Sequence, residues 1–223
     1  MTFAQEFTGR EEAYLSYDFD LRKRTRDPRI NKKNAKENLL LLKNILDKND
    51  IKFWLLYGTL LGAVREQDFI THDTDTDLGM FFSDITKLIE IKPHLENEGF
   101  QLIRTKYPDD LITFMRNDEY IDLGLFRPTS NLFAKFWVYQ KNKEKYSYFK
   151  KFDEINLFDT TFLAPYNHLK FLEEHYGKNW RVPIKNFPQI TMGFSGFKRR
   201  VKYFLESSRI GRKLVVIYKK IIN

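Results

Sequence analysis

The chain has 223 residues, of which 42% are apolar and 16% aromatic, so it can bury the core of a domain and wholesale disorder is excluded. It contains no cysteine, which excludes disulfides, cysteine-ligated metals and thiol catalysis. The formal charge of +8 belongs to the C-terminal end, because residues 196–223 carry nine Lys or Arg and one Glu, which leaves residues 1–195 neutral.

The first elements expected along the chain are a helix, a buried strand and a second helix. A start signal at Asp27-Pro28 and apolar residues at three- and four-residue spacing predict an amphipathic helix over 31–49. The run of β-forming and aromatic residues over 51–57 predicts a buried strand that ends at Gly58-Thr59. A short helix is expected directly after it, over 60–65.

The rest of the chain alternates between strand and helix signals. Residues 76–82 predict a second strand, and the helix expected over 84–98 is divided or ended by Pro93. Further strands are expected over 100–106, 111–116, 119–126, 132–140 and 145–152, the last two as a hairpin around Asn142-Lys143. A helix over Pro165–Tyr176, ended by Gly177, follows. This order predicts an α+β fold, with a mixed or antiparallel sheet and helices packed on it.

Acidic residues are concentrated where the chain enters the second of these strands. Asp73, Asp75 and Asp77 alternate, so at least Asp75 and Asp77 should lie side by side on one face. The run Asp-Leu-Gly-Met-Phe that begins at Asp77 is echoed by Asp-Leu-Gly-Leu-Phe, which begins at Asp122. If the two strands are neighbours, Asp75, Asp77 and Asp122 converge. We expect the glycine two places after each aspartate to leave space there for a ligand.

Three ionised carboxylates a few ångströms apart repel one another, and one of them would be forced to take up a proton. A divalent cation removes this conflict, and an all-oxygen site selects Mg²⁺ or Mn²⁺ over softer metals. The usual work of such a site is to hold phosphate oxygens in line with an attacking hydroxyl. The spacing of the acids therefore predicts a metal-dependent phosphate site.

The turn before the short helix supplies the matching phosphate side of this site. Backbone N–H groups at Gly58 and Thr59 and the positive helix end favour an anion, and Thr59 is a candidate cap. Arg65, at the far end of the helix, could reach a phosphate or pair with an aspartate. His72 and Asp73, next to the metal acids, are grouped with the same donor-binding side.

The same acidic residues also fit other uses, which involve either a different metal site or no site at all. The acidic run also scans as the start of an EF-hand loop, although Leu78 stands where that loop needs glycine. A solvated acidic turn is the commoner use of such a run, and Asp122 taken alone resembles a surface residue of an edge strand. The three remaining histidines form no metal set and are expected at the surface: His94, His168 and His175.

Several of these runs together resemble a known family. The run from Tyr57 to Arg65, Tyr-Gly-Thr-Leu-Leu-Gly-Ala-Val-Arg, is followed by Phe69-Ile-Thr-His-Asp-Thr-Asp-Thr-Asp77. Both are similar to the signature of the LicD/fukutin-type phosphotransferases of the nucleotidyltransferase superfamily, with Thr71-His72 in place of the family's Pro-Trp. Tyr120-Ile121-Asp122 resembles the later strand with the third acid, and 165–177 resembles the closing helix.

The resemblance implies transfer of a phosphorylated alcohol, such as phosphocholine or a polyol phosphate, from a CDP-activated donor to a sugar hydroxyl, with release of CMP. The implied acceptor is a glycan or lipid-linked glycan of the cell surface, such as a capsule, lipopolysaccharide or teichoic acid. Asp75, Asp77 and Asp122 would be the catalytic metal ligands, with Asp122 as a base. Gly58 and Thr59 would contact the donor phosphate.

Two other functions remain as alternatives. The first keeps the fold but transfers the nucleoside monophosphate itself to a small molecule or a protein. The second is an RNA-binding module that uses the basic tail and the Lys-interleaved aromatics of the expected hairpin. The neutral body of the protein argues against nucleic acid as the partner.

The basic tail adds a prediction about location. Residues 1–10 lack the apolar segment of a secretory signal, and the longest apolar run of the tail, Leu214–Tyr218, is far shorter than the roughly 20 residues that cross a bilayer. We therefore expect a cytoplasmic protein. Apolar residues at helical spacing among the Lys and Arg of 196–223 predict an interfacial helix on an anionic membrane surface, or a helix docked on the protein's own core.

Overall fold

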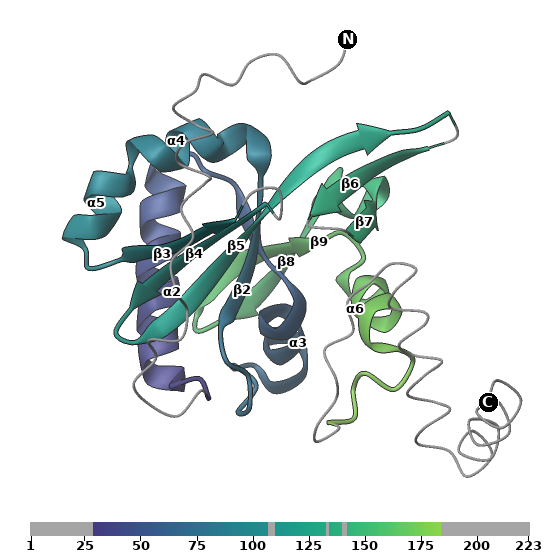
Figure 1. Cartoon of the computed structure of the whole chain (residues 1–223). Helices are drawn as coiled ribbons and strands as arrows, with labels where there is room; N and C mark the ends of the chain where they lie inside the picture. Colours follow the sequence, from purple (N-terminus) through teal and green to yellow (C-terminus); the bar gives the residue numbers. More distant parts are fainter. Residues whose placement is uncertain (1–28, 107–109, 133, 140–141, 184–223) are drawn as a thin grey trace, which may run out of the picture.

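The computed structural model of the chain describes residues 29–106, 110–132, 134–139 and 142–183 (Figure 1). The expected helix start at Asp27-Pro28 and the expected interfacial tail over 196–223 lie outside these residues. The sequence favours a division into a nucleotidyltransferase-like catalytic domain over 1–195 and a basic amphipathic tail over 196–223, and this division stays a prediction.

A mixed sheet of seven strands organises the described part of the chain, in the order β1-β2-β5-β4-β3, with β6 paired to β5 and β7 paired to β6. Its strands are β1 (Phe53–Leu55), β2 (Thr76–Phe81), β3 (Gln101–Lys106), β4 (Leu111–Arg116), β5 (Glu119–Ser130), β6 (Lys135–Tyr139) and β7 (Asn142–Lys145). The pair β2–β5 is parallel and the other pairs are antiparallel. The long strand β5 runs beyond the central sheet to carry β6 at its far end (Figure 1).

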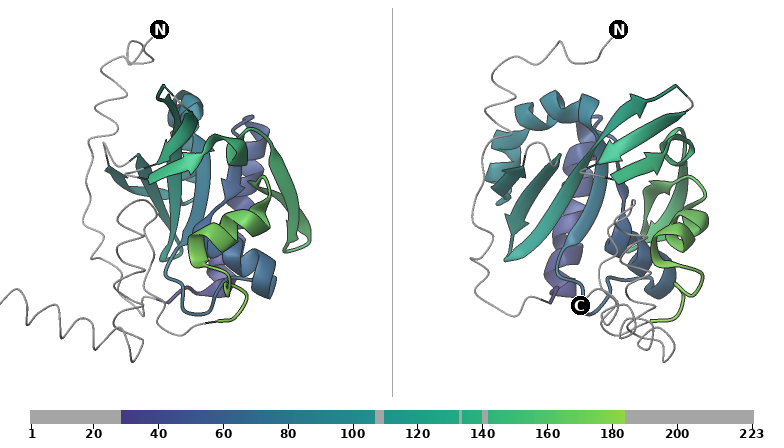
Figure 2. Two further views of the ribbon diagram at one scale, coloured as in Figure 1. Left: turned by 90° about the vertical axis from the view of Figure 1, so that its right-hand side faces the viewer. Right: turned by 45° about the vertical axis from the view of Figure 1, so that its right-hand side comes forward.

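Five α-helices accompany the sheet in the described residues: α2 (Lys32–Lys48), α3 (Tyr57–Glu66), α4 (Ile85–Glu90), α5 (Lys92–Asn97) and α6 (His168–Tyr176). Short 3₁₀ turns lie at Phe82–Asp84 and Tyr146–Phe149. A second, two-stranded sheet consists of β8 (Phe152–Leu157) and β9 (Thr160–Pro165). Figure 2 shows α2 behind the central strands and α6 beside α3 on the flank near β2. The α+β fold with a mixed sheet is confirmed.

Helix α2 forms as its sequence predicts. The side chain of Asn31, its N-cap, accepts a hydrogen bond from the Asn34 backbone N–H at 3.2 Å. Leu39, Leu42 and Leu46, at three- and four-residue spacing, are fully buried. Pro93 sits in the first turn of α5, so it divides the expected helix over 84–98 as predicted.

The aromatic part of the core surrounds Trp54 of β1, which is fully buried. Its ring lies 4.9 to 5.2 Å from the rings of four phenylalanines, measured between centroids: Phe81, Phe126, Phe149 and Phe152. These rings come from β2, from β5, from the 3₁₀ turn before β8 and from β8 itself, so one side chain joins the two sheets. The expected strand over 51–57 is shorter than predicted because Tyr57 already belongs to α3.

The second half of the chain differs from the sequence prediction in two places. Asn142-Lys143, expected as the turn of a hairpin, lies in strand β7, and the predicted strand over 145–152 is mostly a 3₁₀ turn. The hairpin β8–β9 was not expected at all. Its turn at Phe158 and Asp159 has φ of 55° and 60°, a left-handed conformation usually signalled by Asn or Gly. Strand β9 ends at Pro165, so α6 begins three residues later than expected.

His175 is buried, and its expected surface position is wrong. Its Nδ1 lies 2.8 Å from the carbonyl oxygen of Phe171, and its Nε2 lies 3.1 Å from Glu144 Oε1. Because a carbonyl can only accept, Nδ1 carries a proton, and one further proton is shared between Nε2 and the Glu144 carboxyl. Both side chains are at most 5% exposed, so this pair fastens α6 to β7 inside the protein.

Candidate active site

Asp77 and Asp122 are direct neighbours in the sheet. Strands β2 and β5 pair in parallel, and the register places Asp77 opposite Asp122, followed by Leu78 opposite Leu123 and Gly79 opposite Gly124. The two echoed runs of the sequence therefore lie side by side, with their carboxylates on one face. Asp75 precedes β2 by one residue, and its negative charge raises the pKa values of both carboxyls. The structure thus brings Asp77 and Asp122 together as expected, with Asp75 near enough for its charge to act on both.

The start of helix α3 binds Asp77 through two hydrogen bonds. The backbone N–H of Gly58 donates to Asp77 Oδ2 at 3.0 Å, and the hydroxyl of Thr59 accepts from the Asp77 backbone N–H at 2.8 Å. The helix begins at Tyr57, its N-cap is Leu56, and no side chain caps it, so the expected cap by Thr59 is wrong. Thr59 is 2% exposed, and its hydroxyl ties the helix to β2 instead.

Asp73 lies against the same helix start. A Cβ atom placed on Gly58 would be 2.3 Å from Asp73 Oδ2 and 3.2 Å from Asp77 Oδ2, so glycine is what allows both carboxylates to approach the backbone here. The Asp73 carbonyl accepts a hydrogen bond from the Ile30 N–H at 2.7 Å, which anchors the loop beside the N-terminus of α2.

Asp122 has two partners that sequence reasoning missed. Thr113 of β4 donates its hydroxyl to Asp122 Oδ1 at 2.6 Å, and the Arg104 guanidinium of β3 lies 3.5 Å from Asp122 Oδ2. Thr113 is opposite Asp122 in the register of β4 with β5, and Arg104 is opposite Thr113 in the register of β3 with β4. Only the sheet order could have shown this, because the three residues are distant in sequence.

Burial and mutual repulsion raise the pKa values of the clustered acids. Burial, then the charge of Asp75, raises the pKa of Asp73 to about 7 and that of Asp122 to about 6. The pKa of Asp77 is raised well above its usual value by burial and by the charges of Asp75, Asp73 and Asp122. The Thr113 hydrogen bond and the charge of Arg104 lower the pKa of Asp122, which limits its rise. The site therefore concentrates negative charge that a cation would neutralise.

The donor chemistry of this cluster fits Mg²⁺ or Mn²⁺, since every side-chain donor is a carboxylate oxygen and the acids carry the electrostatic conflict that a divalent ion relieves. As the side chains stand, however, no three acidic or histidine groups in the described ranges are arranged to hold an ion. Binding would require the carboxylates to turn closer together. The metal ligands Asp75, Asp77 and Asp122 accordingly stay a prediction.

The space expected beside the two strand glycines is filled by the protein itself. A Cβ atom on Gly79 would be 2.3 Å from the Trp54 indole nitrogen, and one on Gly124 would be 2.9 Å from the Tyr139 ring. The expectation of room for a ligand there is therefore wrong. Tyr139 instead lies close enough to the acids that the charges of Asp122 and Asp77, after burial, raise the pKa of its hydroxyl.

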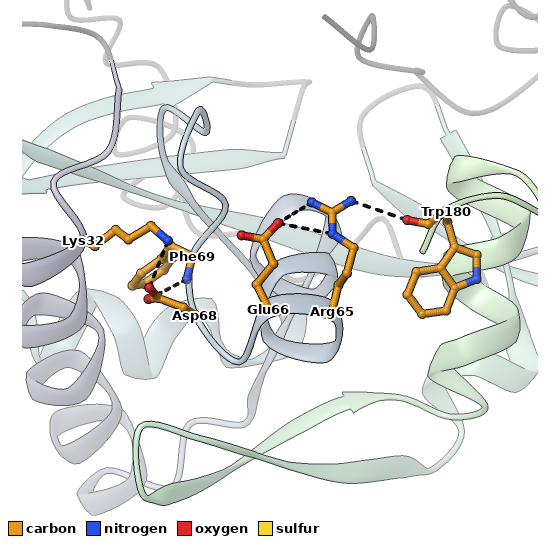
Figure 3. A network of polar contacts seen from close by, with 6 residues as sticks. All are labelled: Lys32, Arg65, Glu66, Asp68, Phe69 and Trp180. Atoms are coloured by element: carbon orange, nitrogen blue, oxygen red, sulfur yellow. Dashed lines mark hydrogen bonds and ion pairs between the residues drawn. The ribbon is translucent and has the colours of Figure 1, made fainter. Parts of the chain in front are cut away.

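Arg65 is held by partners outside the acidic cluster (Figure 3). Its guanidinium forms an ion pair with Glu66 at 2.5 Å and donates to the carbonyl oxygen of Trp180 at 3.4 Å. This contact joins α3 to the segment that follows α6. Just after the end of α3, Asp68 forms an ion pair with Lys32 of α2 at 2.9 Å (Figure 3). His72 is exposed at the tip of the loop between α3 and β2.

Comparison with known proteins identifies a family. The sequence model of the LicD/FKTN/FKRP nucleotidyltransferase domain matches residues 50–175, more than half of the 223-residue chain. The matched range begins just before β1 and ends in α6, so it contains the helix start and all four aspartates.

Curated relatives extend this match. Ribitol-5-phosphate transferase FKTN of Homo sapiens is 30% identical over 165 residues, covering 70% of this chain and 35% of that protein. An uncharacterized protein, RP689 of Rickettsia prowazekii, is 43% identical over 75 residues, covering 32% of this chain and 28% of its own length. The chain thus spans about a third of the length of the curated relatives it matches.

Solved structures give a weaker likeness. A lincomycin-bound lincosamide antibiotic adenylyltransferase, LnuA, has a TM-score of 0.44 at 14% identity, covering 62% of this chain and 86% of that one. This score is too low to support an argument about fold or function. Within the described residues, no helix has the length and apolar character needed to cross a membrane.

Proposed function

The chain belongs to the LicD/FKTN/FKRP nucleotidyltransferase-domain family, and we propose that it transfers a phosphorylated alcohol from a CDP-activated donor to a sugar hydroxyl of a glycan, releasing CMP. The observation that carries this proposal is the convergence of Asp75, Asp77 and Asp122 at the β2–β5 pair beside the start of α3. The relatives named as ribitol-5-phosphate transferases support a polyol phosphate as the transferred group.

In this reaction the acceptor hydroxyl oxygen forms a bond to the phosphorus that carries the alcohol. The bond between that phosphorus and the oxygen of CMP breaks, and the hydroxyl proton must go to a base. We assign the proton to the carboxyl of Asp122, which stands opposite Asp77 in the sheet. CMP leaves with the bridging oxygen and its electron pair.

Asp75, Asp77 and Asp122 are the residues that would hold the metal. A bound Mg²⁺ or Mn²⁺ supplies positive charge that offsets the two donor phosphates and the acids themselves. The protein's own contribution is to fix the carboxylates: Gly58 N–H and the Thr59 hydroxyl hold Asp77 from one side, and Thr113 holds Asp122 from the other.

The remaining predicted donor contacts receive specific roles in this proposal. Gly58 and Thr59 act by fixing Asp77 against α3, since the Gly58 N–H and the Thr59 hydroxyl both bond to that residue. Arg65 supports the site by joining α3 to Trp180. His72, exposed beside Asp73, is the side chain of this set that we assign to the donor.

The proposal is tested with the full chain, a panel of CDP-linked alcohols, and either Mg²⁺ or EDTA. We expect a CDP-alcohol to raise the melting temperature only when metal is present, and Asp77→Asn to abolish the rise. Asp47→Asn, which changes an aspartate of the exposed ion pair with Lys43 on α2, is the matched control and should keep the rise. Stabilisation that chelation leaves unchanged would contradict metal dependence.

The products distinguish the proposed reaction from its alternative. Release of CMP together with a phospho-alcohol on a glycan acceptor supports phosphoalcohol transfer. A product that carries the nucleotide itself would instead show nucleoside monophosphate transfer. Binding to anionic vesicles by the full chain, lost when residues 196–223 are removed, tests the proposed membrane location at the cytoplasmic face.

A further inference from the structure

One polar row crosses the otherwise apolar centre of the sheet. In the register of four adjacent strands, Asp77 of β2 is opposite Asp122 of β5, Asp122 is opposite Thr113 of β4, and Thr113 is opposite Arg104 of β3. Directly opposed residues point to the same face, so the four side chains stand in line. The apolar neighbours Ile112, Phe114, Ile121 and Leu123 are fully buried.

The hydrogen bonds along this row have one direction. The Arg104 guanidinium can only donate, and its Nε–H donates to the Thr113 hydroxyl at 3.3 Å. The Thr113 hydroxyl accepts this bond, so its own proton is free to be donated to another group, and it donates to Asp122 Oδ1 at 2.6 Å. A second guanidinium nitrogen lies 3.5 Å from Asp122 Oδ2. Both carboxylate oxygens of Asp122 thus have a donor on the β4 and β3 side of the sheet.

This arrangement opposes the tendency of Asp122 to leave the cluster. The charge of Asp75 acts on Asp122 and Asp77 alike, and repulsion would drive an unrestrained carboxylate to another rotamer or to protonation. Thr113 is 1% exposed, so its hydroxyl has no solvent to bond instead. Its χ1 is stiff because it is β-branched.

We propose that Thr113 and Arg104 are positioning residues, which hold the Asp122 carboxylate in line with Asp77 so that both reach one divalent ion. Thr113 acts directly, and Arg104 acts mainly by fixing the direction of the Thr113 hydroxyl. The inference rests on the proposed function, because it assigns these residues to the metal site of that reaction. Partners that orient a ligand typically contribute 10- to 100-fold to metal affinity or activity.

The test is titration of the chelator-treated full chain with Mn²⁺ alone, followed by electron paramagnetic resonance, which reads metal binding without turnover. We expect Thr113→Val, which keeps the side-chain shape and removes the hydroxyl, to weaken Mn²⁺ binding by about tenfold or more. Thr113→Ser keeps the hydroxyl and should bind within about threefold of the unsubstituted chain. In transfer assays, Thr113→Val should lower kcat while the KM for the donor changes little.

Thr105→Val is the matched control. Thr105 is equally buried on β3, but as the next residue after Arg104 it points to the opposite face of the sheet. This variant should lose stability without changing Mn²⁺ affinity. Arg104→Lys keeps the positive charge and removes the Nε–H donor, so it should weaken Mn²⁺ binding in the same direction as Thr113→Val, by a smaller factor. It also serves if Thr113→Val does not fold.

The outcomes separate this inference from the function on which it rests. If the unsubstituted chain binds Mn²⁺ and Thr113→Val and Arg104→Lys bind it equally well, the positioning role is refuted and the metal site stands. If Thr113→Ser is as impaired as Thr113→Val, packing and not the hydroxyl is responsible, which also refutes it. If the unsubstituted chain binds neither Mn²⁺ nor Mg²⁺, the metal-dependent function fails first, and the inference fails with it.

Discussion

Asp77 and Asp122 stand opposite each other in the parallel pairing of β2 and β5. Among the described strand pairs of the seven-stranded sheet, this is the one that places two carboxylates directly opposite each other. Like charges directly opposite in a sheet are destabilising, so their pairing opposes the stability of the fold. Folding accepts this arrangement because apolar burial around both strands is extensive.

Removing one of these charges should stabilise the metal-free protein while it abolishes transfer. Asp122→Asn relieves the repulsion from Asp75 and can still accept the Thr113 hydrogen bond. The raised pKa of Asp122 corresponds to a gain of about 1 to 3 kcal/mol in the free energy of unfolding at pH 7. Urea denaturation in EDTA measures this gain in the free energy of unfolding, with Asp47→Asn as the control. A variant that is both less stable and fully active would contradict the proposed cluster.

Stability of the metal-free protein should rise as the pH falls from about 7.5 to about 5.5. The pKa of Asp73 is raised to about 7 and that of Asp122 to about 6 in the folded chain, so the native state takes up protons before the unfolded state does. Burial raises both pKa values most, and the charge of Asp75 raises both further. Glu66 also raises the pKa of Asp73, whereas the Thr113 hydrogen bond and the charge of Arg104 lower that of Asp122. Unfolding curves at a series of fixed pH values measure how steeply the free energy of unfolding depends on pH. The double variant Asp73→Asn/Asp122→Asn should make this dependence weaker.

Two glycines beside the site should respond oppositely to alanine. Gly58→Ala places a Cβ atom against the movable carboxylate of Asp73 and adds a better helix former, so stability should stay level or rise by up to about 1 kcal/mol while activity is lost. Gly79→Ala meets the buried Trp54 ring and should lower the free energy of unfolding by about 1 to 3 kcal/mol. Thermal melts and activity assays on both variants measure these effects. Equal loss of stability in the two variants would contradict the prediction, because it would show that the Asp73 carboxylate cannot move away from residue 58.

The buried pair of Glu144 and His175 should matter far more than a nearby exposed pair. Glu144→Ala leaves His175 without its partner inside the protein, and breaking a buried pair in this way costs about 3 to 5 kcal/mol. Glu174→Ala removes the partner of Lys145 and Tyr148 near the surface, at a cost of about 1 kcal/mol or less. Chemical denaturation compares the two. Similar losses would mean that the α6–β7 contact does not depend on this pair.

The sequence predicted the two strands that carry the candidate site better than it predicted the periphery. Strands β2 and β5 could be foreseen from their patterns and their shared run of residues, whereas their parallel pairing comes from the structure. Strand β7 could not, because its inward-facing residues, Asn142 and Glu144, are polar, so the usual alternation is reversed. Glu144 is satisfied by His175, which comes from an element thirty residues further along the chain and so leaves no local signal.

The roles of individual side chains were harder to predict than the elements that carry them. Trp54 and Tyr139 fill the space over the two strand glycines, and nothing near those glycines in sequence indicates which ring would arrive. The sequence around Thr113 has no feature that distinguishes it from other strand residues, and its role follows only from the strand order, which places it opposite Asp122. Contacts across a sheet depend on register, which no local pattern specifies for strands separated by other elements.

The double attachment of Asp77 to the start of α3 has a consequence for the segment between them. Because Gly58 and Thr59 bond to Asp77 across 19 and 18 positions of sequence, α3 and the loop after it form a closed unit whose two ends are held together. The outer turn of the loop, Thr71-His72, is exposed and takes no part in these two bonds, so side-chain changes there leave the attachment of Asp77 to the helix in place.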